Sequence, residues 1–113
     1  MSDTYPILFT FKSLVAGKGF LVGVVAQGRA LLTEDGGECW MMGVNPGSVA
    51  ASGAQRGDAF CAFKEGYLSV LYDIANEAET FEAFEQEVKE FFAATNEPNE
   101  RDWQQALREV RAG

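Results

Sequence analysis

The chain has 113 residues, 47% of them hydrophobic, and a formal net charge of −8. This length suits a single domain over residues 1–113, and the hydrophobic fraction is that of a folded protein rather than a disordered one. A phosphate backbone repels so acidic a surface, so direct binding of nucleic acid is not expected.

Targeting signals and metal-ligand motifs are not evident in the sequence. No apolar run approaches the roughly 20 residues that cross a bilayer. The first residues, MSDTYPILFTFK, place an acid ahead of the apolar segment, unlike the basic start of a signal peptide. Cys39 and Cys61 are too few for a disulfide framework, and the chain has no histidine. We therefore expect a cytoplasmic protein that contacts no membrane and holds no metal or cofactor.

The N-terminal part of the chain has the composition of β-strands. Aromatic and aliphatic residues with partial alternation predict strands over residues 7–15 and 20–26. The intervening Gly-Lys-Gly, residues 17–19, predicts a turn. Gln27-Gly28 indicates a break or a bulge after the second strand.

A hairpin is predicted next, with strands over residues 29–34 and 38–44. Asp35-Gly36-Gly37 separates them, and glycine tolerates the positive φ that such a tight turn demands. The second strand carries Trp40 and Met42. If this strand lies at the edge of the sheet, these side chains invite pairing with another chain, and core packing is the alternative.

Helical periodicity begins after Gly53. Apolar residues at helical spacing predict a helix over about 55–76, with Gly66 among small residues that suggest close approach to the sheet or to another subunit. Thr80 is a good N-cap for a second helix, whose apolar face contains Phe81, Phe84, Val88, Phe91 and Phe92.

Thr95 to Asn99 contains Pro98 and indicates a short break before a third helix. That helix is expected to face inward with Trp103, Ala106, Leu107 and Val110. The order of elements predicts an α+β fold: an N-terminal antiparallel sheet of about four strands, including a short return strand, with two to three helices packed on it.

Acidic residues gather in two places. Glu34, Asp35 and Glu38 surround the predicted hairpin turn, where a solvated turn is favoured over a cation site. Nine acids and only one base, Lys89, lie between residues 73 and 100. This acidic surface is compatible with a basic protein partner, although acidity also arises for solubility.

One stretch of the sequence resembles the HicB-like antitoxin family. The resemblance covers residues 30–75 and rests on Gly37 and Trp40 on a strand, the Pro46-Gly47 turn, Gly53, and Asp58-Ala59 opening a helix. Gln55 and Asp58 depart from the family's Thr-x-x-Glu helix start, and further helices follow the matching region.

The resemblance implies a small sheet with a helix packed on it, usually oligomeric, that neutralises a small basic RNA-cleaving toxin. We therefore expect a noncatalytic protein that forms a homodimer and binds a small basic partner. The candidate contact residues are Trp40, Met42, Glu82, Glu85 and Glu90. The alternatives are a structural or interaction module of another kind, and a small enzyme that uses carboxylates near the glycine-rich turns.

Overall fold

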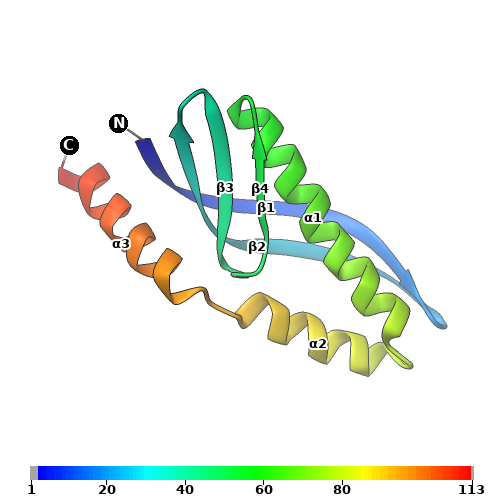
Figure 1. Ribbon diagram of the computed structural model, residues 1–113. Coiled ribbons are helices and arrows are strands. Elements are labelled where there is room, and N and C mark those ends of the chain that lie inside the picture. The colour runs from blue at the N-terminus through cyan, green and yellow to red at the C-terminus, as the bar shows by residue number, and fades with distance from the viewer. Residues whose placement is uncertain (1–2, 113) are drawn as a thin grey trace.

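The computed structural model of the chain describes residues 3–112 and confirms the predicted α+β architecture (Figure 1). Within this range an antiparallel sheet pairs its strands in chain order, and three helices follow. The strands are β1 (Asp3–Gly17), β2 (Phe20–Asp35), β3 (Glu38–Asn45) and β4 (Ala50–Gly53). The helices are α1 (Arg56–Glu77), α2 (Phe81–Ala93) and α3 (Glu97–Ala112).

β2 runs without interruption through Gln27-Gly28, so the predicted break there is wrong. Gly28 pairs with Phe9 on β1, and a Cβ on Gly28 would collide with the backbone carbonyl oxygen of Asn45 and stand 2.8 Å from the ring of Phe9. The glycine therefore makes room for the backbone of β3 and for an aromatic side chain instead of ending the strand. The irregularity lies one residue later, between Arg29 and Ala30, where the register with β3 shifts.

The hairpin between β2 and β3 has the predicted turn. Gly36 and Gly37 both have positive φ, at 61° and 81°, which is the conformation of a type I′ turn. Asp35 and Glu38 pair on either side of it. The two glycines are therefore required by the backbone geometry of the turn.

β3 lies inside the sheet because the predicted short return strand, β4, pairs along it, so the edge-strand alternative for Trp40 and Met42 does not apply. Trp40 pairs with Thr33 on β2 and with Ser52 on β4. The outermost strands are β1 and β4. The short return strand is what converts β3 from an edge into an interior strand.

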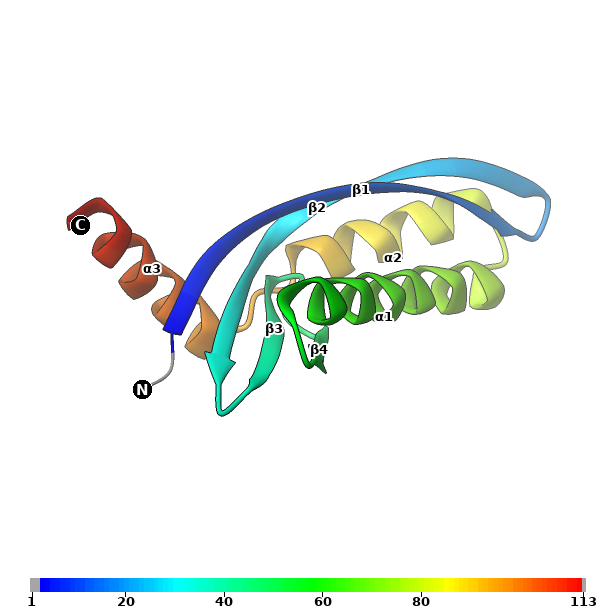
Figure 2. The same ribbon diagram turned by 90° about the horizontal axis from the view of Figure 1, so that it is seen from above.

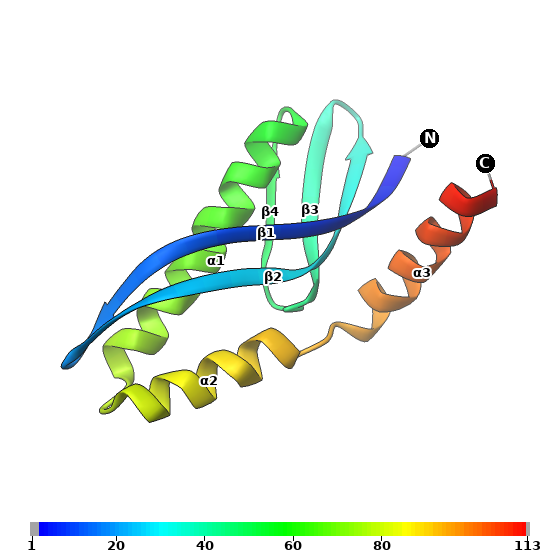
Figure 3. The same ribbon diagram turned by 180° about the vertical axis from the view of Figure 1, so that it is seen from behind.

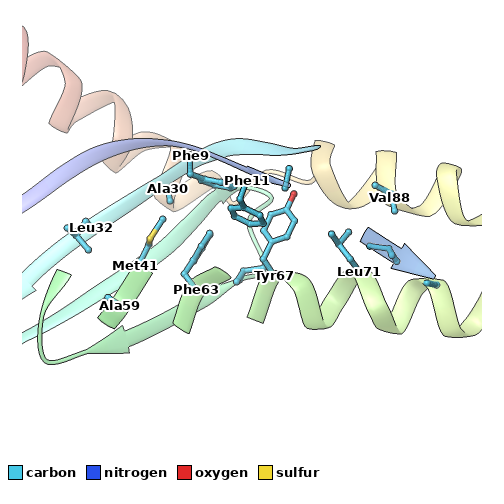
Figure 4. Packing of buried hydrophobic residues seen from close by; sticks show 14 of the residues in the cluster. Phe9, Phe11, Ala30, Leu32, Met41, Ala59, Phe63, Tyr67, Leu71 and Val88 are labelled. Carbon is cyan, nitrogen blue, oxygen red and sulfur yellow. The ribbon is translucent and has the colours of Figure 1, made fainter. Parts of the chain in front are cut away.

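α1 packs on one face of the sheet, called here the inner face. Its buried residues repeat every four positions, as one stripe of a helix does: Ala59, Phe63, Tyr67, Leu71 and Ala75. Figure 4 shows Phe63 and Tyr67 directed at Phe9 and Phe11 of β1. Gly66 has only ordinary contact, 3.6 Å from its would-be Cβ to Val49, so the predicted close approach does not occur there.

α2 completes the cover of the inner face. The Thr80 hydroxyl accepts a hydrogen bond from the Ala83 amide at 3.1 Å, which confirms the predicted cap. Phe84 and Val88 are buried in the same core as α1. Figure 2 shows the curved β1–β2 hairpin arching over both helices.

α3 lies on the opposite face, called here the outer face, where Trp103 and Ala106 pack against Leu31 and Val44 (Figure 3). The helix begins at Glu97, inside the predicted break, because Pro98 occupies the first turn, where no backbone donor is needed. Val110 is 61% exposed, so the prediction that it faces inward is wrong.

Candidate functional site

The loop between β3 and β4 fixes where α3 starts. The amide of Gly47 donates to the carbonyl of Ala94 at 2.9 Å, and the amide of Asn96 donates to the carbonyl of Val44 at 2.9 Å. The Asn99 side chain donates to the carbonyl of Gly43 at 2.9 Å. These bonds hold the connection between α2 and α3 against the sheet, so that α3 crosses the outer face in a defined position.

Arg29 provides a second attachment between α3 and the sheet. Its guanidinium donates to Glu100 at 2.6 Å and to Asn45 Oδ1 at 2.7 Å. The same guanidinium lies 4.9 Å from the centre of the Trp103 ring, within the range of a cation–π contact. One side chain of β2 thus contacts the first two turns of α3.

A groove of about 360 Å³ separates α3 from the outer face of the sheet, and we call it the outer-face groove. Leu31, Thr33 and Met42 line it from the sheet, and Asp102, Gln105 and Glu109 line it from α3. The Gln105 side chain donates to Glu109 at 3.2 Å and accepts from Arg108 at 2.8 Å. Two carboxylates therefore face a groove whose sheet side includes the apolar side chains of Leu31 and Met42.

Trp40 lies beside this groove. It is 43% exposed, and its neighbours on β2 and at position i+2 are Thr33 and Met42, both of which line the groove. Alternation along β3 explains the placement, because Cys39 and Met41 face the core while Trp40 and Met42 face outward. Two of the predicted contact residues are therefore together on the outer face.

The predicted acidic residues Glu82, Glu85 and Glu90 are exposed on α2, and the structure does not bring them to Trp40. Figures 1 and 3 show α2 at the end of the molecule away from the turn between β2 and β3. Glu85 pairs with Lys89 at 3.8 Å, and Glu90 accepts from Gln86 at 3.2 Å.

The carboxylates that line the outer-face groove together with Met42 are Asp102 and Glu109 of α3, which the sequence reasoning missed. Asp102, Gln105 and Glu109 are spaced by three and four residues, the spacing of one helical face. This signal was visible in the sequence. The position of this helical face relative to Trp40 was not visible in the sequence, because that position depends on where α3 crosses the sheet.

Glu34, at the hairpin between β2 and β3, belongs to an ion pair. Arg56 donates to its two carboxylate oxygens at 2.7 and 3.0 Å, and this bonding holds the pKa of Glu34 below its ordinary value. The thiol of Cys39 lies 3.8 Å from the same carboxylate, and burial raises the pKa of this thiol. Glu34 therefore fastens the start of α1 to the hairpin.

The described residues, 3–112, contain neither a cluster of metal ligands nor a membrane-spanning helix. No three His, Cys, Asp or Glu side chains in this range are grouped so that they could hold a metal ion. Among these residues, no helix is both long enough and apolar enough to span a membrane. Comparison of the chain with protein-family models, with curated proteins and with solved structures finds no match.

Proposed function

We propose that this chain is a noncatalytic cytoplasmic protein that binds a small basic protein partner at the outer-face groove. The observation that carries the proposal is the position of Trp40 and Met42 beside a groove lined by Asp102 and Glu109. A lysine or arginine of the partner would lie between the two carboxylates, and its neighbouring residues would contact the exposed indole.

The resemblance to HicB-like antitoxins supports a particular kind of partner. A small RNA-cleaving toxin carries a basic surface to hold its phosphate substrate, and an acidic groove competes for that surface. The net charge of −8 would accelerate the encounter at low salt. The homodimer expected from the sequence is a separate proposal that concerns another surface.

The first test is to purify the tagged protein from its host and to identify what copurifies, with the mass of the complex in solution. A small basic protein in fixed ratio is the expected result. Coexpression of this protein with a small RNA-cleaving toxin encoded next to it should also protect cells from that toxin. If no basic protein copurifies and no protection is seen, the proposal is wrong.

A pair of charge variants then locates the surface. Asp102→Asn with Glu109→Gln should weaken binding of the captured partner by about tenfold or more, and Trp40→Ala should do the same. Glu82→Gln with Glu85→Gln removes the same amount of charge from α2 and is the matched control. Equal weakening by both pairs would show that overall charge, rather than the groove, holds the partner.

A further inference from the structure

β1 leaves a long edge of the sheet unpaired. Within residues 3–112 it pairs only with β2, and its residues Leu8 and Leu14 are 77% and 68% exposed. Pro6 shows which backbone groups point outward, because a proline fits a strand only where its missing N–H would face away from the neighbour. Thr10 and Lys12 share the alternate positions of Pro6, so their N–H groups also face the open edge.

A second groove, called here the edge groove, follows this open edge near the start of β1. It measures about 650 Å³ and lies between Pro6 and Leu8 of β1 and Leu107 and Val110 of α3. α3 contacts β1, and the two lie on the same side of the molecule in Figures 1 and 3, whereas Figure 2 shows the last turns of the helix extending past the start of the strand. The last turns of α3 thus overhang the open edge and leave an apolar space beneath.

The other end of the same hairpin carries a bare apolar patch on the outer face. Leu14 and Leu21 are each 68% exposed, and Val25 is 48% exposed. Gly23 pairs with Leu14, and nothing lies within 4 Å of where its Cβ would be. The patch therefore combines projecting aliphatic side chains with a hollow.

The exposed surface is larger than that of a compact monomer of the same mass, as the elongated shape requires. The accessible area is 6715 Å², whereas a compact monomer of 12.3 kDa exposes about 6,100 Å². The radius of gyration is 15.3 Å, against about 13 Å for a compact chain of this length. The surplus of roughly 600 Å² is comparable to what one partner buries in a standard interface.

The geometry points to a second copy of this chain as the occupant: two copies pair antiparallel through the open edges of β1, and Leu14 of each fills the edge groove of the other. The edge groove and the patch lie near opposite ends of one strand. Antiparallel pairing about a two-fold axis therefore brings the patch of each copy to the groove of the other. An unrelated peptide on the edge would leave the patch bare.

The charge on β1 selects the register. Lys12 is the only charged residue between Thr4 and Gly17, and an axis through it would oppose two ammonium groups. An axis through Thr10 instead sets Lys12 of one copy against Leu8 of the other, where its aliphatic stem covers the leucine. The same axis sets Leu14 against Pro6, which lines the edge groove and has no N–H to donate, so the ladder of backbone hydrogen bonds ends at this pair and the side chain of Leu14 supplies the contact.

Surface variants test the interface through the mass of the protein in solution over a range of concentrations. The wild type should be a dimer, and Leu14→Glu and Val110→Glu should each raise the dimer dissociation constant by about tenfold or more. Both side chains are exposed, so the circular dichroism spectrum should not change. Phe60→Glu is the matched control on α1, where the side chain is 37% exposed, and it should leave the dimer intact.

Gly23→Val provides a variant that favours folding and opposes association. The added side chain has open space in the single chain and raises the β-propensity of β2, so thermal stability should hold or rise. The same side chain stands beside Leu14, its cross-strand partner, and would crowd Leu14 as it enters the edge groove of the other copy, so the dimer should weaken. A wild-type monomer at every concentration, or a dimer that Leu14→Glu and Val110→Glu leave intact, would overturn the proposal.

Cross-linking tests the register. In a Cys61→Ser background, Thr10→Cys should form a disulfide between copies on mild oxidation, because directly opposed residues lie about 5.5 Å apart between Cα atoms. Leu14→Cys is the control, since two such residues lie eight positions apart along the paired strands, about 26 Å. Cross-linking of Leu14→Cys as readily as Thr10→Cys would contradict this register and the proposal with it.

Discussion

Arg29 of β2 and Glu100 of α3 form an ion pair at 2.6 Å across 71 residues of sequence. Their side chains are only 24% and 28% exposed, and Asn45 takes a further donor of the guanidinium. This pair holds α3 on the outer face, and the outer-face groove exists only because α3 lies there.

A double-mutant cycle should measure this attachment. Arg29→Met and Glu100→Gln should each lower the free energy of unfolding, and the coupling energy between them should be about 1–2 kcal/mol, as for a partly buried hydrogen bond to a charged group. Urea unfolding of the wild type, the two single variants and the double variant gives the coupling energy. Lys89→Met with Glu85→Gln is the exposed control pair and should couple by less than about 0.5 kcal/mol. Equal coupling in the two cycles would contradict a special role for Arg29.

The pairing of Glu34 with Arg56 should make stability depend on pH. Hydrogen bonding by Arg56 lowers the pKa of Glu34 in the folded chain below its ordinary value of 4.5. The contribution of Glu34 to folding stability is therefore complete at pH values above its pKa in the unfolded chain. It is lost as the pH falls through the folded pKa. The difference in unfolding free energy between wild type and Glu34→Gln should therefore shrink as the solution is acidified below about pH 4.5.

The carboxyl resonance of Glu34, followed by NMR during a pH titration, checks the cause directly. Arg56→Gln removes the donor and should move the pKa of Glu34 back toward its ordinary value. An unchanged midpoint in Arg56→Gln would show that another group holds this carboxylate ionised.

Features that depend on neighbouring residues were predictable from the sequence. Thr80 caps α2 because its hydroxyl reaches an amide three residues away, and Gly36 and Gly37 turn the chain within two residues. Both signals are local chemistry. Alternation likewise predicts that Trp40 and Met42 share a face, since it depends only on the period of a strand.

Features set by distant contacts were not predictable. The short return strand was predicted and is confirmed as β4, whereas the side of the sheet that α3 crosses was not predicted. The course of α3 depends on Asn99 reaching Gly43, 56 residues away, and on Arg29 reaching Glu100. The exposure of Val110 follows from the same course, because a helix that overhangs the sheet loses its cover at the end. The candidate site combines these two kinds of information, and only its sheet residues were found from the sequence.

Tyr67 stands at the centre of the core with a hydroxyl that has no hydrogen-bond partner among the described residues. The rings of Phe11 and Phe91 lie 5.0 and 5.1 Å from its own, and burial raises its pKa. Tyr67→Phe keeps the ring and removes an unpaired polar group, so the free energy of unfolding should rise by about 1 kcal/mol.

Thermal and urea unfolding measure this change, with Tyr72→Phe as the control. The hydroxyl of Tyr72 lies 3.3 Å from Ser13 Oγ at the surface, and its removal should alter stability by less than about 0.5 kcal/mol. A clear loss of stability in Tyr67→Phe would indicate that the buried hydroxyl is bonded, for instance to an internal water.

Replacing each of two glycines near the start of α1 by alanine should change the stability in opposite directions. A Cβ on Gly53 would lie 2.6 Å from the Cβ of Asp58 and 2.7 Å from the amide of Ala59, so Gly53→Ala must displace the first turn of the helix. We expect it to lower the free energy of unfolding by about 1–3 kcal/mol. A Cβ on Gly57, inside that turn, meets nothing within 4 Å, and Gly57→Ala should raise stability by about 0.5 kcal/mol.

Urea unfolding of Gly53→Ala and Gly57→Ala measures the two changes in stability. The structure at the start of α1 explains why stability is sensitive to these substitutions. Gln55 stands at the N-cap without a side-chain hydrogen bond, so this end of the helix depends on packing against Gly53 and on the pair of Arg56 with Glu34. Adding Gln55→Ser to Gly57→Ala should raise stability further, by about 0.5–1 kcal/mol. A neutral Gly53→Ala would mean that the first turn of α1 shifts at no cost, and the Glu34–Arg56 pair would then be its main attachment.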